Sequence, residues 1–239
     1  MELRGASALV TGAGRGIGRS IALALGGAGV SVTGVARTAS ELESLVREIE
    51  RAGGRARAYR GDVRQRESCD GAVAAAVDAH GGLQILVNNA GIGHSAPLAE
   101  TSDQAWDDVL GTNLTAVFRL TRAALPHLTR RGGHVFMISS LAGSNPIAGM
   151  APYCASKAAL DHLAQCLMLE VRHQGVKVTT IAPGSVDTSF GSADREPRRQ
   201  EWMLRPGDIA SAVLDLLRTR DDAHQSRVEM RPLRPQKRA

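Results

Sequence analysis

The chain has 239 residues, of which 43% are hydrophobic and 3% aromatic, and its formal net charge is +5. This length fits one α/β domain with a full core, and no apolar run approaches the roughly 18 residues that a membrane helix needs. Five basic residues and one acid within 227–239 supply most of the net charge, so no broad basic face for nucleic acid is expected.

The first residues enter a strand pattern directly, without the layout of a signal peptide. Cys69, Cys154 and Cys166 are an odd number of cysteines without paired spacing. We therefore expect reduced thiols and a cytoplasmic protein rather than a disulfide framework.

A short apolar strand at 7–10 is followed by a glycine-rich turn and then by a helical pattern. The turn contains Gly12, Gly14, Gly16 and Gly18, with Arg15 and Ile17 between them. The strict G-x-G-x-x-G fingerprint is not met, because the glycines follow T-G-x-x-x-G-x-G instead. A strand, a glycine turn and a helix in this order predict a phosphate-binding turn at a helix N-terminus.

The second predicted strand, 30–35, ends next to Arg37 and Thr38. In a dinucleotide-binding fold this strand end faces the adenosine ribose, where an acid would bind the 2′-hydroxyl. No acid precedes Glu41 here, and Arg15 of the glycine turn can reach the same region. Guanidinium and hydroxyl groups suit a 2′-phosphate, so this neighbourhood favours NADP(H) over NAD(H).

Strands and helices then alternate along the chain. We predict helices at 40–51 and 65–79, and strands at 56–59 and 83–87. This alternation predicts a parallel sheet built from right-handed βαβ units. Such sheets bind ligands at the carboxyl ends of their strands, where Gly12, Arg37, Asp62 and Asn88 all fall.

In the second half of the chain, Ser102 is positioned to cap a helix that continues through Asn113 to about Leu125. The remaining predicted elements are a strand at 134–139, a helix at 152–173, a strand at 176–181, a polar cover at about 185–206, a helix at 206–217 and an edge strand at 227–230. These patterns predict one domain over 1–226, followed by an edge strand and a basic tail over 227–239.

Tyr153 and Lys157 are four residues apart in a predicted helix, which places both side chains on one face. An ammonium beside a phenol stabilises the phenolate, so we expect the pKa of Tyr153 to lie below its ordinary value of about 10. Ser140 follows the preceding strand and adds a hydroxyl. Together these three groups can polarise and protonate a carbonyl oxygen.

These motifs, in this order and spacing, resemble the short-chain dehydrogenase/reductase family in its ordinary-length form, over at least 6–217. The similarity extends to 3-oxoacyl-carrier-protein reductase-like members. The matching pieces are the glycine turn, Asp62-Val63, Asn88-Asn89-Ala90-Gly91, Asn113, Ser140, Tyr153-Cys-Ala-Ser-Lys157, and Pro183-Gly184 with Val186 and Thr188. The resemblance implies a single-domain, three-layer Rossmann fold with a doubly wound, seven-stranded parallel sheet.

The resemblance also implies a catalytic tetrad of Asn113, Ser140, Tyr153 and Lys157. Lys157 would hold the nicotinamide ribose, and Asn113 would help to keep a water that relays protons. The implied cofactor-binding residues are those of the glycine turn with Arg37, Thr38, Asp62, Val63, Asn89, Ala90, Gly91, Tyr153, Lys157, Pro183, Gly184, Val186 and Thr188. Within them, Asp62 and Val63 would hold the adenine, and Thr188 would meet the nicotinamide amide. In this family a basic residue at the position of Arg37 goes with NADP(H).

The implied reaction is hydride transfer between nicotinamide C4 and a carbonyl carbon, with Tyr153 as the general acid in reduction. The expected substrate is a small-molecule ketone or a 3-oxoacyl thioester. Two alternatives remain open: an alcohol or sugar dehydrogenase that uses NAD, and a dinucleotide-binding sensor without turnover. Neither nucleic acid nor membrane is an expected partner.

Two other kinds of chemistry are disfavoured by the sequence. Ser140 lacks the G-x-S-x-G elbow of a serine hydrolase. The seven histidines are scattered without ligand spacing, so no metal is expected.

The C-terminus departs from the resemblance. Relatives that reduce acyl-carrier thioesters often end in a Thr-Gly-x-x-x-x-Val-Asp-Gly-Gly segment that supports a tetramer, whereas this chain continues from Arg227 as RVEMRPLRP. We expect a homodimer or homotetramer, with a dimer packed through the helices that carry Asn113 and Tyr153.

Overall fold

The computed structural model describes residues 1–190 and 200–235. Residues 191–199 of the predicted cover and the last four residues of the basic tail lie outside this part of the chain. Among the described helices, none combines the length and the apolar character that crossing a membrane requires.

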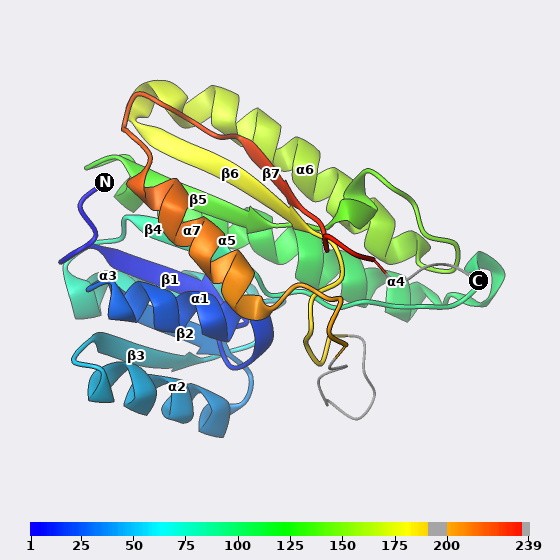
Figure 1. Cartoon of the computed structure of the whole chain (residues 1–239), viewed down its shortest axis with the longest axis horizontal. Helices are drawn as coiled ribbons and strands as arrows, with labels where there is room; N and C mark the ends of the chain where they lie inside the picture. The colour runs from blue at the N-terminus through cyan, green and yellow to red at the C-terminus, as the bar shows by residue number, and fades with distance from the viewer. Residues whose placement is uncertain (191–199, 236–239) are drawn as a thin grey trace.

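Seven strands form one parallel sheet in the order β3-β2-β1-β4-β5-β6-β7 (Figure 1). The strands are β1 (Ser7–Thr11), β2 (Ser31–Ala36), β3 (Arg55–Arg60), β4 (Ile85–Asn88), β5 (Gly133–Ile138), β6 (Val176–Pro183) and β7 (Arg227–Met230). The strand order reverses direction between β1 and β4, which defines a doubly wound sheet with a switch point there. The predicted fold class is confirmed.

Helices cover both faces of the sheet (Figure 1). On one face lie α1 (Gly16–Gly27), α2 (Ala39–Arg51) and α7 (Pro206–Arg218); on the other lie α3 (Arg66–His80), α5 (Ala116–Leu128) and α6 (Ala151–Val171). The helix α4 (Asp103–Leu110) precedes α5. Neighbouring residues of β1 pack into opposite layers, Ala8 and Val10 against α1, α2 and α7, and Leu9 against α3, α5 and α6.

The predicted strands and most of the predicted helices match the observed ones to within two residues at each end. Ser102 caps α4 as predicted, because its hydroxyl accepts a hydrogen bond from the Ala105 N–H at 3.2 Å. The long helix predicted through Asn113 is interrupted by a π-helical turn at Gly111–Thr115. A π turn widens the backbone by one residue, and such turns recur at functional sites.

Candidate active site

The glycine turn between β1 and α1 forms part of a cavity at the carboxyl edge of the sheet. Gly12 and Gly16 have φ angles of +64° and +56°, a conformation that favours glycine. A side chain at Gly12 would also meet Asn89, whose amide donates to the Thr11 carbonyl oxygen at 2.8 Å. The helix α1 begins at Gly16, so its free N–H groups lie at the cavity wall and suit a phosphate.

The cavity has a volume of about 530 Å³ and contains both predicted cofactor-binding residues and predicted catalytic residues in its lining. It is lined by Gly12, Gly14, Arg15, Gly16, Ile17, Arg37, Thr38, Asp62, Val63, Asn89, Ala90, Gly91, Ser140, Tyr153, Lys157, Pro183, Gly184, Val186 and Thr188. Two predicted site residues, Gly18 and Asn113, do not line it. A Cβ atom on Gly18 would collide with the Gly12 carbonyl oxygen, so this glycine allows close packing behind the turn.

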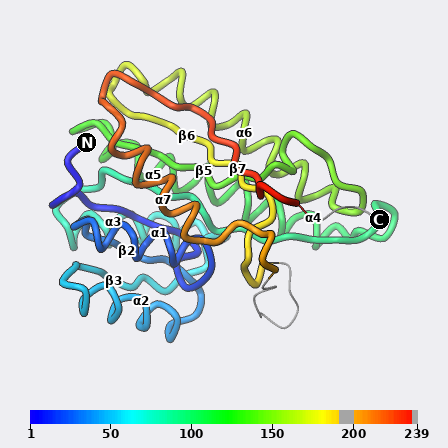
Figure 2. Tube along the Cα trace, in the orientation of Figure 1, coloured from blue at the N-terminus to red at the C-terminus, as the bar shows by residue number. Residues whose placement is uncertain are grey.

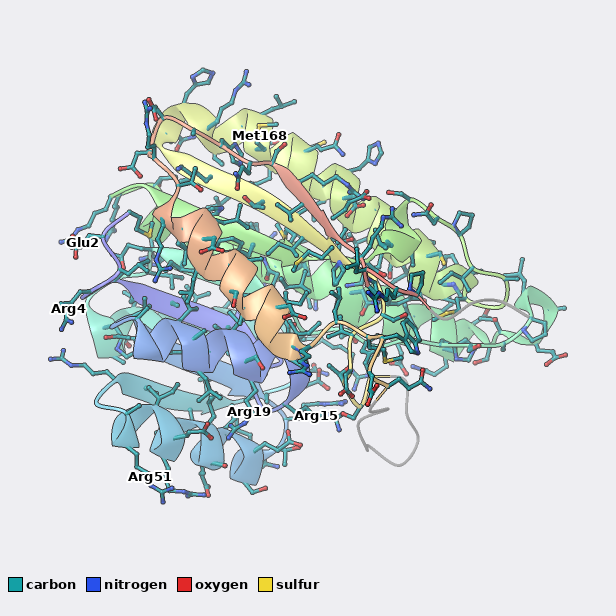
Figure 3. All side chains as sticks on the ribbon, in the orientation of Figure 1. Glu2, Arg4, Arg15, Arg19, Arg51 and Met168 are labelled. Atoms are coloured by element: carbon teal, nitrogen blue, oxygen red, sulfur yellow. The ribbon has the colours of Figure 1, made fainter. Side chains whose placement is uncertain are left out.

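One end of the cavity is rich in charge. Arg37 and Thr38 follow β2 and line this end. Arg15, within the glycine turn, lies at the edge where the strands end (Figure 3). One acid at this end was not predicted as a site residue: Glu41 lines the cavity and packs against Gly14. The end of the cavity predicted to bind the adenosine ribose therefore contains a carboxylate as well as two guanidinium groups.

Arg64 was not predicted as a site residue, yet it contacts the predicted adenine-binding carboxylate. Its Nη2 donates to Oδ2 of Asp62 at 2.8 Å, and its Nε donates to the same oxygen at 3.1 Å. Its Nη1 forms a second ion pair with Asp108 of α4 at 2.5 Å. The hydrogen bond from Arg64 is the main reason why the pKa of Asp62 is lowered. No local sequence pattern marks this pairing with α4.

The other end of the cavity brings together Ser140, Tyr153 and Lys157. Ser140 lies just after β5, and the other two residues lie on successive turns at the start of α6. Lys157 is buried, and its Nζ donates to the Ile138 carbonyl oxygen at 2.8 Å. Tyr153 is 9% exposed, and Nζ of Lys157 lies 5.8 Å from the centre of its ring.

The prediction that the pKa of Tyr153 lies below its ordinary value is wrong. Burial raises the pKa of Tyr153 above its ordinary value, and a hydrogen bond with Ser140 opposes this only in part. Burial also lowers the pKa of Lys157 to about 8, while the charge of Asp161 acts in the opposite direction. The spacing of Tyr153 and Lys157 indicated their proximity but could not reveal the desolvation of both groups.

Asn113 is fully buried behind the cavity wall. Its side-chain oxygen accepts from the Ile92 N–H at 2.9 Å, and its amide donates to the Ile92 carbonyl oxygen at 2.9 Å. The amide also lies 3.0 Å from the Ser156 hydroxyl. Asn113 therefore ties the loop after β4 to α6, and the π turn places it there.

The described part of the predicted cover closes over the Tyr153 end. Thr188 packs against Gly16, so that a Cβ atom on this glycine would lie 3.3 Å from the Thr188 methyl group. Phe190 has its ring centre 5.7 Å from that of Tyr153 and approaches Gly93. Phe190 and Met203 both line the cavity, which gives this end an apolar wall.

The cavity suits a dinucleotide in shape and chemistry. Its glycine turn and the N-terminus of α1 suit phosphates, its charged end suits a nucleoside, and its other end carries a phenol and an ammonium. Its position at the switch point of a doubly wound sheet is where such folds bind ligands. Within the described ranges, no three His, Cys, Asp or Glu side chains gather to hold a metal ion. Fold and site together define a dinucleotide-binding oxidoreductase.

The chain belongs to the short-chain dehydrogenase/reductase family. The family model described as short chain dehydrogenase matches residues 6–199. A 3-oxoacyl-[acyl-carrier-protein] reductase, FabG, from Vibrio cholerae is 35% identical over 222 residues, which cover 89% of this chain and 90% of the relative.

Solved structures show the same fold. A metagenomic short-chain oxidoreductase in complex with NADP has a TM-score of 0.86 and 36% identity, covering 98% of this chain and 100% of that one. A short chain dehydrogenase from Mycobacterium paratuberculosis bound to NAD has a TM-score of 0.89 and 27% identity. The match covers 96% of this chain and 97% of that one. Both dinucleotides therefore occur among proteins with this fold.

Proposed function

We propose that the protein is an NADP(H)-dependent reductase of a ketone or a 3-oxoacyl thioester. The observation that carries this proposal is the single cavity that joins Arg15 and Arg37 at one end to Ser140, Tyr153 and Lys157 at the other. When bound there, NADPH would supply a hydride to the carbonyl carbon. The chain's own residues would then orient the carbonyl and deliver the proton that its oxygen needs.

Tyr153 would be the proton donor. Burial raises the pKa of Tyr153 above its ordinary value, so the phenol keeps its proton at neutral pH. It would give this proton to the carbonyl oxygen as the hydride arrives. The Ser140 hydroxyl would hydrogen-bond the same oxygen. Lys157, with a pKa of about 8, is mostly charged at neutral pH and would hold the nicotinamide ribose and stabilise the phenolate that forms. Asn113 would act by holding the loop after β4.

The preference for NADP(H) rests on the groups at the charged end. Arg15, Arg37 and Thr38 suit the 2′-phosphate. Glu41 opposes it, because a carboxylate near that phosphate would repel it. The alternative, an NAD-dependent alcohol or sugar dehydrogenase, is favoured by this same carboxylate. A non-catalytic sensor would need no proton donor, whereas this chain has all four tetrad residues.

The substrate proposal is supported at two levels. The FabG-type relative is named a 3-oxoacyl-[acyl-carrier-protein] reductase. The wall formed by Phe190 and Met203 suits an apolar group next to the carbonyl.

We also propose a cytoplasmic location, because the free cysteines Cys69, Cys154 and Cys166 suit a reducing compartment.

We also propose that the protein forms a homodimer or homotetramer. Phe118 on α5 is 46% exposed and Leu169 on α6 is 56% exposed, on the helices expected to pack in a dimer. Both helices lie on the same face of the sheet, and large apolar side chains exposed there suit an interface. Light scattering of the purified protein would contradict this proposal if it gave the mass of a monomer.

Changing Tyr153 to Phe tests the reaction directly. This variant keeps the ring and removes the proton donor, so we expect NADPH binding within about two-fold of the wild type and a loss of turnover of at least about 100-fold. Fluorescence titration measures binding, and initial rates on a panel of ketones and 3-oxoacyl thioesters measure turnover. Normal turnover in Tyr153→Phe would contradict the assignment.

A further inference from the structure

Arg227, the first residue of β7, joins this strand to the helix that carries Tyr153 and Lys157. Its Nη1 lies 2.6 Å from Oδ2 of Asp161 in α6. Its Nη2 donates to the Ser144 hydroxyl at 2.8 Å. The two ends of the ion pair are 66 residues apart in the sequence, and β7 and α6 lie side by side in Figure 2.

Asp161 follows Lys157 by one helical turn and is almost completely buried. Its side chain is 7% exposed, whereas that of Arg227 is 31% exposed. The second carboxylate oxygen of Asp161 is buried and has no hydrogen-bond partner among the described residues. A buried carboxylate depends strongly on its ion-pair partner, because breaking the pair removes much of the charge that compensates it.

The same contact reaches the turn that carries Ser140. This turn continues into a short 3₁₀ helix, η3 (Leu141–Gly143), and Ser144 follows it. It packs closely on α6, since a Cβ atom on Gly143 would lie 2.8 Å from Oδ2 of Asp161 and 3.1 Å from the Lys157 carbonyl oxygen. Arg227 therefore contacts α6 through Asp161 and the Ser140 turn through Ser144, at the place where the two pack together.

We propose that the Asp161–Arg227 ion pair is a positioning device that fixes the Lys157 turn of α6 against the Ser140 turn, so that the C-terminal strand supports the reaction. This inference rests on the proposed function. In the proposed reaction, Asp161 and Arg227 would contact neither the substrate nor the cofactor. They act by holding Ser140, Tyr153 and Lys157 in the arrangement that proton transfer needs, where small displacements are costly.

The pair also sets the charge around Lys157. Lys157 faces Asp161 and Tyr153 on its own helix and the Ile138 carbonyl on β5. Asp161 faces Lys157 on α6, Arg227 on β7, and the uncharged η3. On β7, Arg227 also binds Glu229, which in turn binds Arg231. The negative charge of Asp161 favours the charged form of Lys157, so its removal should let the lysine lose its proton at lower pH.

Four variants and one control test the proposal in the full-length protein. Arg227→Met breaks the ion pair, and Arg227→Lys keeps the charge. Asp161→Asn removes the carboxylate charge with little change of shape. The double variant Asp161→Asn/Arg227→Met avoids an unpaired buried charge if Arg227→Met fails to fold. Arg231→Met is the matched control, since it breaks an ion pair on the same segment that does not reach α6.

The first readout is the pH profile of kcat and kcat/KM with NADPH and the best carbonyl substrate of the panel. We expect Arg227→Met to lower kcat by about ten-fold or more with NADPH affinity within about two-fold, and Arg227→Lys to recover most of that loss. Asp161→Asn and the double variant should move the alkaline limb down by about half a pH unit or more. If the Asp161–Arg227 pair only stabilised the fold, the variants would lower stability without moving the alkaline limb of the pH profile.

The second readout is hydrogen exchange of residues 139–145, which needs no activity. We expect faster exchange in Arg227→Met and in the double variant, and wild-type exchange in Arg231→Met. An active wild type whose folded variants keep its kcat, alkaline limb and exchange rates would overturn the proposal and leave the proposed function intact. A wild type inactive on the whole panel would contradict the proposed function instead, and the exchange rates would still decide whether Arg227 fixes the turn.

Discussion

At the residue scale, His134 shows how burial sets the chemistry of a side chain. It is 3% exposed in β5 and stacks on Phe136 with ring centres 4.0 Å apart. Its Nε2 lies 2.8 Å from the Thr179 hydroxyl, which donates its own proton to the Gln225 carbonyl oxygen at 2.6 Å. His134 is therefore the donor to Thr179. Burial, with smaller effects from the charges of His224 and Lys177, lowers the pKa of His134 to about 3.

This residue should make the protein less stable in acid. The unfolded chain binds a proton at His134 below about pH 6.5, whereas the folded protein does so only near pH 3, so stability falls as the pH decreases through this window. The neutral variant His134→Gln should reduce the loss of unfolding free energy between pH 7 and pH 4.5 by about 2–3 kcal/mol. Urea unfolding at the two pH values measures this, with His162→Gln on the exposed face of α6 as the control. Equal pH dependence in wild type and His134→Gln would contradict the expectation.

At the scale of an element, two glycines in α1 differ in what surrounds them. A Cβ atom on Gly18 would collide with the Gly12 carbonyl oxygen and the Asn89 amide, whereas one on Gly27 would meet nothing within 4 Å. The first glycine brings α1 against the turn, and the second only ends the helix. The glycine pattern in the sequence does not separate these two roles, since both residues lie in the same helix.

These surroundings predict opposite effects of the same substitution. Gly27→Ala should stabilise the protein by about 0.4–1 kcal/mol, because alanine reduces the freedom of the unfolded chain. Gly18→Ala should destabilise it by more than that and weaken NADPH binding, since the turn must move. Urea unfolding and fluorescence titration measure both effects. A Gly18→Ala protein as stable as Gly27→Ala would rule out the tight packing described for this turn.

At the scale of the whole molecule, the cavity connects the ends of β1, β2, β3, β4, β5 and β6, so a ligand that fills it should stabilise the entire fold. NADPH at about 100 times its dissociation constant should add about 2.7 kcal/mol and raise the melting temperature by roughly 5–10 °C. Arg37→Asp should remove most of this shift for NADPH and preserve it for NADH. Differential scanning fluorimetry measures both shifts. Equal shifts of the wild type by the two cofactors at equal concentrations would contradict the NADP(H) preference.

Much of the fold and of the candidate site could be predicted because it depends on patterns among residues that are close together in the sequence. The alternation of strands and helices, the glycine turn after β1, the Ser102 cap and the four-residue spacing of Tyr153 and Lys157 each depend on residues close together in the sequence. Parallel strands then bring their carboxyl ends to one edge. The gathering of Gly12, Arg37, Asp62 and Ser140 around one cavity therefore followed from the topology.

The sequence by itself thus determined the fold class, the family and the sheet edge at which the candidate site lies. Only the tertiary structure decided how the groups in that site are tuned. The Asp62–Arg64 contact with α4, the Glu41 carboxylate beside the glycine turn and the Asp161–Arg227 pair join elements whose contact no spacing reveals. The direction of the Tyr153 pKa also depends on burial by the packed chain, which raises the pKa more than the hydrogen bond with Ser140 lowers it.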